Sequence, residues 1–202
     1  MERQRSPERL VFFSDAVVAI ALTLLVLPLT ELVPELIATG APASEAVTAN
    51  WSKIFSFLLS FAVIGRFWLI HHRIFEHVRA FSTPLVVANF CWLLTIAVLP
   101  FPTQLIGAYP SQPFTVLFYL GTLLVGSVCH TALLFIVRRD PVVRGDAEPV
   151  SDAWARSFVV TTGIFALAVV VACFRPGFGY YVLLLLVLEP LITRRLVTTP
   201  AA

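Results

Sequence analysis

Six apolar stretches, each about as long as a bilayer-spanning helix, dominate the 202-residue sequence. A helix needs roughly 17–25 mostly apolar residues to cross the hydrocarbon core of a membrane. The stretches lie at about 10–29, 51–71, 84–106, 114–137, 154–174 and 178–193, and the last, which Glu189 and Pro190 interrupt, is the shortest. The sequence therefore predicts an all-α membrane protein, with residues 1–202 forming a single domain of six transmembrane helices.

The composition agrees with an integral membrane protein. Hydrophobic residues make up 58% of the chain and charged residues 13%, and the mean hydropathy is +0.89. Soluble domains are usually ~45–50% apolar. A net charge of +2 gives no indication of a nucleic-acid partner. We also find no nucleophile–base or metal-binding constellation, so we expect neither an enzyme nor a cofactor.

The three cysteines, Cys91, Cys129 and Cys173, lie in apolar runs and have no C-x-x-C spacing. Cysteines in such a setting usually behave as small hydrophobic residues. Neither a disulfide framework nor a metal site is therefore expected.

Positive residues gather on alternate connections between the apolar stretches. They are Arg3, Arg5 and Arg9 before the first, Arg73 and Arg79 after the second, Arg138, Arg139 and Arg144 after the fourth, and Arg194 and Arg195 in the tail. The opposite connections hold only Lys53 and Arg175. Because Lys and Arg favour the cytoplasmic side, we expect both termini in the cytoplasm and a multi-pass protein of the cell (plasma) membrane.

An alternative makes residues 1–40 a cleaved signal peptide, because "ATGAPASEA" offers small residues for cleavage. The apolar run here is longer than a usual signal core and contains Asp15. Cleavage would also leave five spans and spoil the alternation of charge. The uncleaved six-span arrangement is the better interpretation.

A carboxylate lies inside the first apolar stretch, where it costs ~2.5–3.5 kcal/mol and needs a partner. Asp15 is six residues inward from Arg9, and Arg66 is seven inward from Arg73. At 1.5 Å per residue both lie ~9–11 Å from the same boundary, so Arg66 is a candidate partner. The alternative contacts are His71 or His72 with Ser14 or Arg9. We expect a structural pair that positions the first helix rather than a direct role in permeation.

A largely apolar stripe runs along the same helix. At 100° per residue, the side chains within about 60° of the direction of Ile20 are Ala16, Ile20, Thr23, Leu24 and Leu27. Asp15 points about 140° away. Taken alone, the stripe favours helix packing or lipid contact, and the other interpretation is a hydrophobic constriction that gates by dewetting.

Two motifs resemble the transmembrane protein 175 family of potassium channels. In the first, Arg9 precedes "FSD" at Phe13, Ser14 and Asp15, and "AIALTLLVLPL" follows, as in the family's first helix. The second, "RFWLIHHRIF", resembles the end of its second helix and contains the possible motif partners Arg66, Trp68, His71, His72 and Arg73. One departure is Ala16, where many relatives have Gly.

The resemblance implies a potassium-permeable cation channel in the lipid bilayer, with potassium as the permeant ion and no cofactor or soluble partner. The first helix would line the pore of a homotetramer, because this chain has one six-span repeat where animal members have two and act as dimers. The constriction would fall on Ile20, Leu24 and Leu27, and Thr23 would aid selectivity. A modest preference for potassium over sodium follows. The alternative function is a secondary transporter of cations or small solutes.

Overall fold

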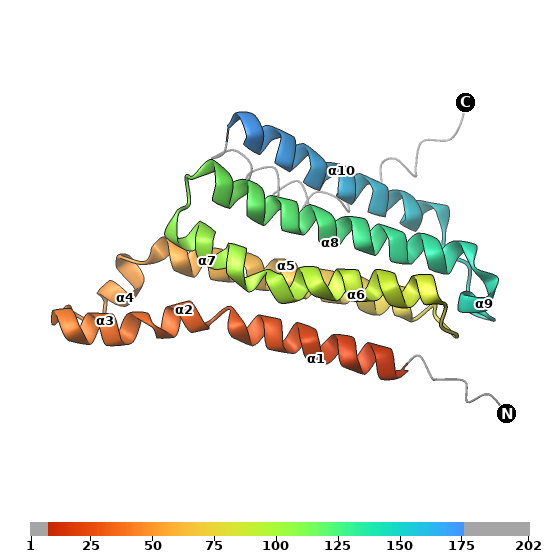
Figure 1. The fold of residues 1–202 in the computed structure, drawn as a ribbon, viewed down its shortest axis with the longest axis horizontal. Helices are drawn as coiled ribbons and strands as arrows, with labels where there is room; N and C mark the ends of the chain where they lie inside the picture. Colours follow the sequence, from red (N-terminus) through yellow and green to blue (C-terminus); the bar gives the residue numbers. More distant parts are fainter. Residues whose placement is uncertain (1–7, 176–202) are drawn as a thin grey trace.

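The computed structural model describes residues 8–175, and within that range the chain is entirely helical, without strands (Figure 1). Five helical segments are long and apolar enough to cross a membrane: Glu8–Thr39, Trp51–Phe75, Thr83–Ala108, Pro113–Arg139 and Asp152–Phe174. The prediction of an all-α membrane protein is confirmed. The predicted sixth span at 178–193 lies outside the described residues.

The helices follow one another with short connections. They are α1 (Glu8–Leu24), α2 (Leu27–Thr30), α3 (Leu32–Thr39), α4 (Glu45–Thr48), α5 (Trp51–Phe75), α6 (Thr83–Val98), α7 (Pro100–Ala108), α8 (Pro113–Arg139), α9 (Pro141–Arg144) and α10 (Asp152–Phe174). Pro lies in the first turn of α2, α6, α7, α8 and α9. Its missing N–H has no helical partner at that position, so Pro begins helices readily.

The first helical segment runs further than the sequence predicted. Pro28 lacks an N–H and its ring crowds the carbonyl four residues back, which accounts for the end of α1 at Leu24. The chain resumes as α2 and α3 instead of forming a loop. It ends at Gly40, whose φ of 68° is the left-handed conformation that glycine adopts at helix ends. The 20-residue span expected at 10–29 is thus part of a 32-residue helical segment.

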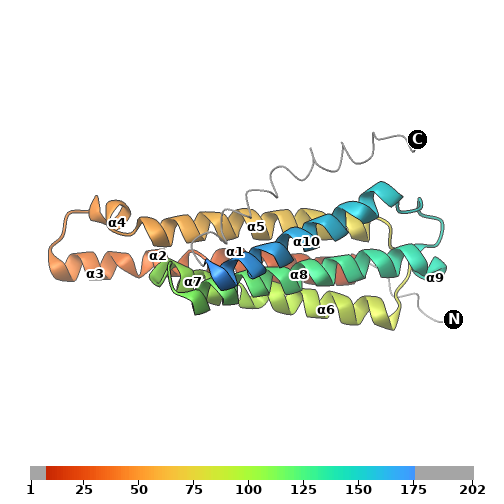
Figure 2. The same ribbon diagram turned by 90° about the horizontal axis from the view of Figure 1, so that it is seen from above.

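The helices form an elongated bundle (Figures 1 and 2). Helix α1 lies along one edge and packs against α6 and α5, whereas α8 packs between α6 and α10. The N-terminal end of α1 and the short helix α9 lie at the same end of the bundle (Figure 1). The described Lys and Arg residues gather toward this end of the bundle. Each lies either in a connection at this end or in the half of its helix that is nearer to this end, and the exceptions are Lys53 and Arg175.

Two connections at this basic end are joined. The backbone N–H of Arg79 donates to the carbonyl of Val143 at 2.7 Å, and the Arg79 side chain pairs with Asp146 at 3.3 Å. Asp140 caps α9 by accepting from the N–H groups of Val142 and Val143. The α5–α6 turn and the α8–α10 connection therefore support each other.

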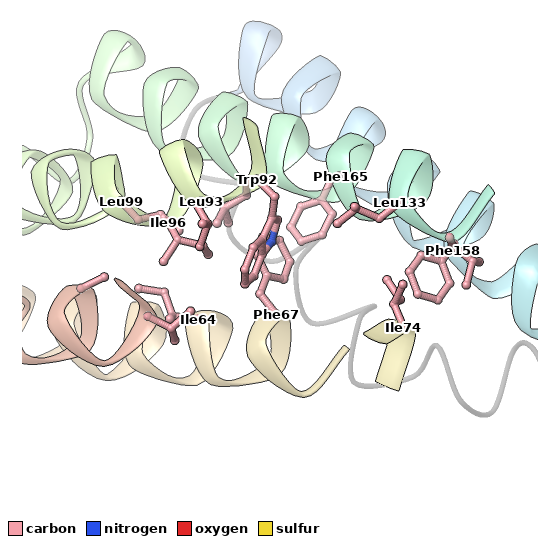
Figure 3. Close-up of a cluster of buried hydrophobic side chains, with 14 of the residues drawn as sticks. Ile64, Phe67, Ile74, Trp92, Leu93, Ile96, Leu99, Leu133, Phe158 and Phe165 are labelled. Carbon is pink, nitrogen blue, oxygen red and sulfur yellow. The ribbon is translucent and has the colours of Figure 1, made fainter. Parts of the chain in front are cut away.

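Large side chains from α5, α6, α8 and α10 fill the centre of the bundle (Figure 3). The rings of Phe67 and Phe165 meet edge to face, with centroids 5.9 Å apart, and Trp92 is fully buried beside them. Gly126 lets α8 approach closely here, because a Cβ at that position would lie 2.8 Å from Cε2 of Phe67. Small residues at helix contacts allow such close approach in membrane proteins.

Candidate pore-lining face and the polar network behind it

Helix α1 has one face inside the bundle and one outside it. Ser14, Val18 and Ala21 are buried against the other helices. The stripe singled out from the sequence lies on the opposite side and continues past the end of α1: Ile20 is 59% exposed and Leu24 39%, Ala16 and Thr23 are exposed as well, and Leu27, the first residue of α2, is 47% exposed. The apolar stripe is therefore available to line a pore, contact another subunit or face lipid.

The hydroxyl of Thr23 is the polar group of this stripe. It donates a hydrogen bond of 2.8 Å to the carbonyl of Ile20, one turn back on the same helix. The only donor of the hydroxyl is thereby engaged in a hydrogen bond within α1, while its oxygen can still accept on the exposed side. Thr23 can therefore offer a cation an oxygen ligand.

A buried hydrogen-bond network holds the inner face of α1. Asn89 of α6 donates from Nδ2 to Oγ of Ser14 at 3.0 Å, and Ser14 donates to the carbonyl of Leu10 at 2.8 Å. Nε2 of His71 lies 2.7 Å from Oδ1 of Asn89 and must carry the proton, because Oδ1 can only accept. Ser14, His71 and Asn89 are each fully buried, so the network ties α1, α6 and α5 together.

Asn89 was not among the residues singled out from the sequence. The available signal was a lone amide inside the apolar run "PLVVANFCWLL", because polar side chains within membrane spans usually bond across helices. The contact suggested between His71 and Ser14 exists only through Asn89.

Asp15 is half-buried and points toward α5, away from the stripe. Its Oδ1 accepts a hydrogen bond of 2.8 Å from Nε1–H of Trp68. Trp68 and His71 are three residues apart on α5 and therefore share one face of that helix. A single face of α5 thus binds Asp15 directly through Trp68 and reaches Ser14 through His71 and Asn89. The pairing of Asp15 with Arg66 remains a prediction.

The other motif residues lie apart. Phe13 is partly exposed and its ring centroid is 5.8 Å from that of Phe90, while Arg9 is exposed near the start of α1. His72 points outward, with Nε2 3.8 Å from a carboxylate oxygen of Glu76. Arg73 is exposed, on the side of α5 that borders α10. Within residues 8–175 no group of three or more His, Cys, Asp or Glu side chains is placed to hold a metal ion.

Aromatic rings enclose His71. It stacks on Trp92 at 4.1 Å and on Phe75 at 4.3 Å. His130 lies close by, with its ring centroid 5.0 Å from that of Trp92. Three buried nitrogens of this cluster have no hydrogen-bond partner among the described residues: Nδ1 of His71, Nε1 of Trp92 and Nε2 of His130. His130 therefore packs within this aromatic cluster, and its Nε2 makes no hydrogen bond within residues 8–175.

The comparisons with known proteins point to one family. Residues 9–100 match the model described as "Endosomal/lysosomal potassium channel TMEM175". A potassium channel of Streptomyces collinus is 36% identical over 101 residues, which is 50% of this chain and 48% of that protein. One of Chamaesiphon minutus is 36% identical over 110 residues, 54% of each chain. The chain thus spans about half the length of these two relatives.

Two further matches are longer. A potassium channel of a Chryseobacterium strain is 25% identical over 183 residues, covering 89% of this chain and 90% of that protein. The crystal structure of a lysosomal potassium-selective channel TMEM175 homolog from Chamaesiphon minutus superposes with a TM-score of 0.75 at 25% identity. This superposition covers 93% of this chain and 97% of the solved one.

Proposed function

Because the chain belongs to the TMEM175 family, we propose that it is a potassium-permeable cation channel of the cell membrane whose pore is lined by α1. The observation that carries the proposal is the two-sided nature of α1. Its polar residues, Ser14 and Asp15, bond inward to α5 and α6, and its apolar stripe lies on the outside of the single subunit.

Ile20, Leu24 and Leu27 form the constriction in this proposal. They are spaced four and three residues apart, so several subunits around one axis would stack them as successive apolar rings. A narrow apolar passage empties of water and blocks ions, and slight widening wets it. Thr23 adds an oxygen ligand beside Ile20. Such a passage discriminates between ions by dehydration, so the preference for potassium over sodium is modest.

The pore requires several copies of the chain, because one helix cannot enclose an aqueous path. We propose a homotetramer, with four copies of α1 around a central axis. A native mass close to four times 22.3 kDa in a nanodisc is the expected result. A conducting monomer would contradict the arrangement.

We further propose that the basic end of the bundle faces the cytoplasm. Arg79, Arg138, Arg139 and Arg144 lie there, whereas Lys53 lies at the opposite end. This asymmetry is the one that orients membrane proteins. It puts the N-terminus inside and the α3–α4 region outside, and six spans return the C-terminus to the cytoplasm.

Single-channel recording of the purified protein in a planar bilayer tests the function. Ile20→Asn should wet the constriction, raise conductance and bring the potassium and sodium permeabilities closer together. Val170→Asn is the matched control, because Val170 is 54% exposed on α10, at the edge of the bundle opposite α1 (Figure 1). Currents of channel size would exclude a transporter. Unchanged currents in a well-folded Ile20→Asn protein would remove α1 from the pore.

A further inference from the structure

A cavity of about 350 Å³ opens between α5, α8 and α10, on the side of the bundle away from α1 (Figure 1). Pockets that hold small ligands usually enclose ~300–1,000 Å³. The polar lining consists of Arg66 and Arg73 of α5, Ser127 and His130 of α8, and Ser157 and Thr161 of α10. Among residues 8–175 no acidic side chain lines it. The lining therefore favours a ligand that carries negative charge.

The cavity extends from the basic end of the bundle into the spans. Arg73 lies two residues from the end of α5, and Trp154 lies two residues from the start of α10. Arg66 lies nine residues from the same end of α5, and His130 lies nine residues from the end of α8. Nine helical residues correspond to about 13 Å. Donor groups are thus present both at the mouth of the cavity and in its deeper part.

The mouth of the cavity lies at the level expected for lipid headgroups. Helices α5 and α8 have 25 and 27 residues, so they are roughly 38 and 40 Å long, whereas the hydrocarbon core is about 30 Å thick. Their ends therefore reach into the headgroup layers. Trp154 is half-buried at the mouth, and tryptophan is enriched at the membrane–water interface.

A buried nitrogen in the deeper part lacks a partner. His130 lines the cavity but is only 2% exposed, and its Nε2 makes no hydrogen bond within the described part of the chain. Leaving a buried donor or acceptor unpaired costs free energy. An acceptor that enters the cavity beside this ring would supply the missing hydrogen bond.

We propose that this cavity binds the headgroup of an anionic phospholipid. The phosphodiester would bind the guanidinium of Arg73 at the mouth, and an ester oxygen further in would accept from Nε2–H of His130. Arg66 has five N–H donors, so it can contact the lipid while it serves another group. The acyl chains would continue over exposed apolar side chains such as Leu69, which also lines the cavity.

This site agrees with a general mode of lipid recognition, in which basic pockets between transmembrane helices bind anionic headgroups. The inference is independent of ion conduction, because it concerns the face of the bundle opposite α1. Phosphatidylglycerol is a suitable probe, since its headgroup carries a net negative charge. Phosphatidylcholine is the matched neutral lipid, because a choline cation accompanies the same phosphate.

Thermal unfolding of the delipidated protein in detergent tests the class of ligand. Phosphatidylglycerol should raise the melting temperature clearly more than phosphatidylcholine does. Inorganic phosphate separates a lipid from a soluble anion and should leave the melting temperature unchanged. Equal stabilisation by the two lipids, as expected if another segment of the chain filled the cavity, would overturn the proposal. A shift with inorganic phosphate as large as that with phosphatidylglycerol would overturn it as well.

Native mass spectrometry of charge variants tests the position of the site. Arg73→Gln should raise the dissociation constant of phosphatidylglycerol about fivefold, which corresponds to one basic residue near an anionic lipid surface. Arg156→Gln is the matched control, because Arg156 is exposed on α10 but does not line the cavity. It removes the same charge and should leave the dissociation constant unchanged. Equal weakening by the two changes would indicate non-specific attraction and overturn the site.

His130→Phe tests the deeper contact. The phenyl ring can keep the packing against Phe67 and Trp92 but has no nitrogen. Without lipid this protein should be at least as stable as the unchanged one, because no unpaired nitrogen remains. Phosphatidylglycerol should then raise its melting temperature less than that of the unchanged protein. An undiminished rise in the folded variant would overturn the proposed contact, and Arg73→Gln tests the site even if His130→Phe fails to fold.

Discussion

The bonds of Asn89 lead to a quantitative prediction for Asn89→Leu. The side chain lies at the centre of the network behind the proposed pore helix, where it accepts from His71 and donates to Ser14. Leucine has nearly the same size and shape, so the change removes two hydrogen bonds without opening a cavity. Ser14 keeps its bond to the carbonyl of Leu10, whereas the buried N–H of His71 loses its acceptor.

The expected cost follows from the number of bonds lost. Hydrogen bonds between side chains in membrane proteins contribute ~0.6 kcal/mol on average and up to ~1.7. Two of them give a loss of about 1–3 kcal/mol in the free energy of unfolding. Since 1.4 kcal/mol corresponds to a factor of ten, the unfolding equilibrium should shift by roughly fivefold to 150-fold.

Reversible unfolding in mixed detergent micelles measures this shift. Leu94→Ala is the control, because Leu94 lies on the same helix and is largely exposed. His71→Phe preserves the stack between Trp92 and Phe75 but removes the N–H, so adding it to Asn89→Leu should restore part of the loss. A cost for Asn89→Leu no larger than that of the control, or strictly additive effects of the two changes, would refute the reasoning.

Two further predictions concern the packing of the bundle. Asp15→Ala should lower tetramer yield and thermal stability before it alters ion selectivity, and Asp15→Asn should have a milder effect. If Arg66 is the partner of Asp15, the double variant Asp15→Leu with Arg66→Leu should lose less stability than the sum of the two single changes. A changed permeability ratio with normal assembly would instead place Asp15 in the ion path. Gly126→Ala should cost about 1–3 kcal/mol in unfolding experiments, because its methyl group would lie 2.8 Å from the ring of Phe67. Gly163→Ala, which meets nothing within 4 Å, should be neutral or stabilising, and equal effects of the two changes would contradict the packing argument.

Hydropathy was enough to predict the five spanning segments of the described chain, because length and apolar character alone decide whether a helix can cross a bilayer. It was a poorer guide to where helices end. The first span was predicted to end at about residue 29, but Pro28 lies in the first turn of α2, where proline is accommodated, and the helical segment runs on to Thr39. Pro100 begins α7 within the third spanning segment, whose predicted range of 84–106 agrees with the observed Thr83–Ala108.

The helical period of 3.6 residues likewise predicted which face of α1 carries the stripe, because Asp15 and Ser14 mark the opposite face. The period cannot say which helix lies behind that face. Asn89 and Trp68 come from α6 and α5 and meet α1 only through tertiary packing. No spacing within one helix encodes such a contact, so the partner of Ser14 was missed.

The two faces of α1 make separable contributions. Ile20 and Leu27 make no polar contact with the network around Asn89, since their exposed side chains point away from it. Changes on the apolar face should therefore act on the hydration of the passage, and changes on the polar face on how firmly α1 is held. In the proposed pore the two contributions meet in one quantity, the radius of the constriction, because α5 and α6 fix α1 through bonds to Ser14 and Asp15. An intramembrane carboxylate well away from the apolar stripe thus has a physical reason to be there: bonded to Trp68, it fixes the rotation of α1 about its axis and so keeps the apolar stripe directed outward.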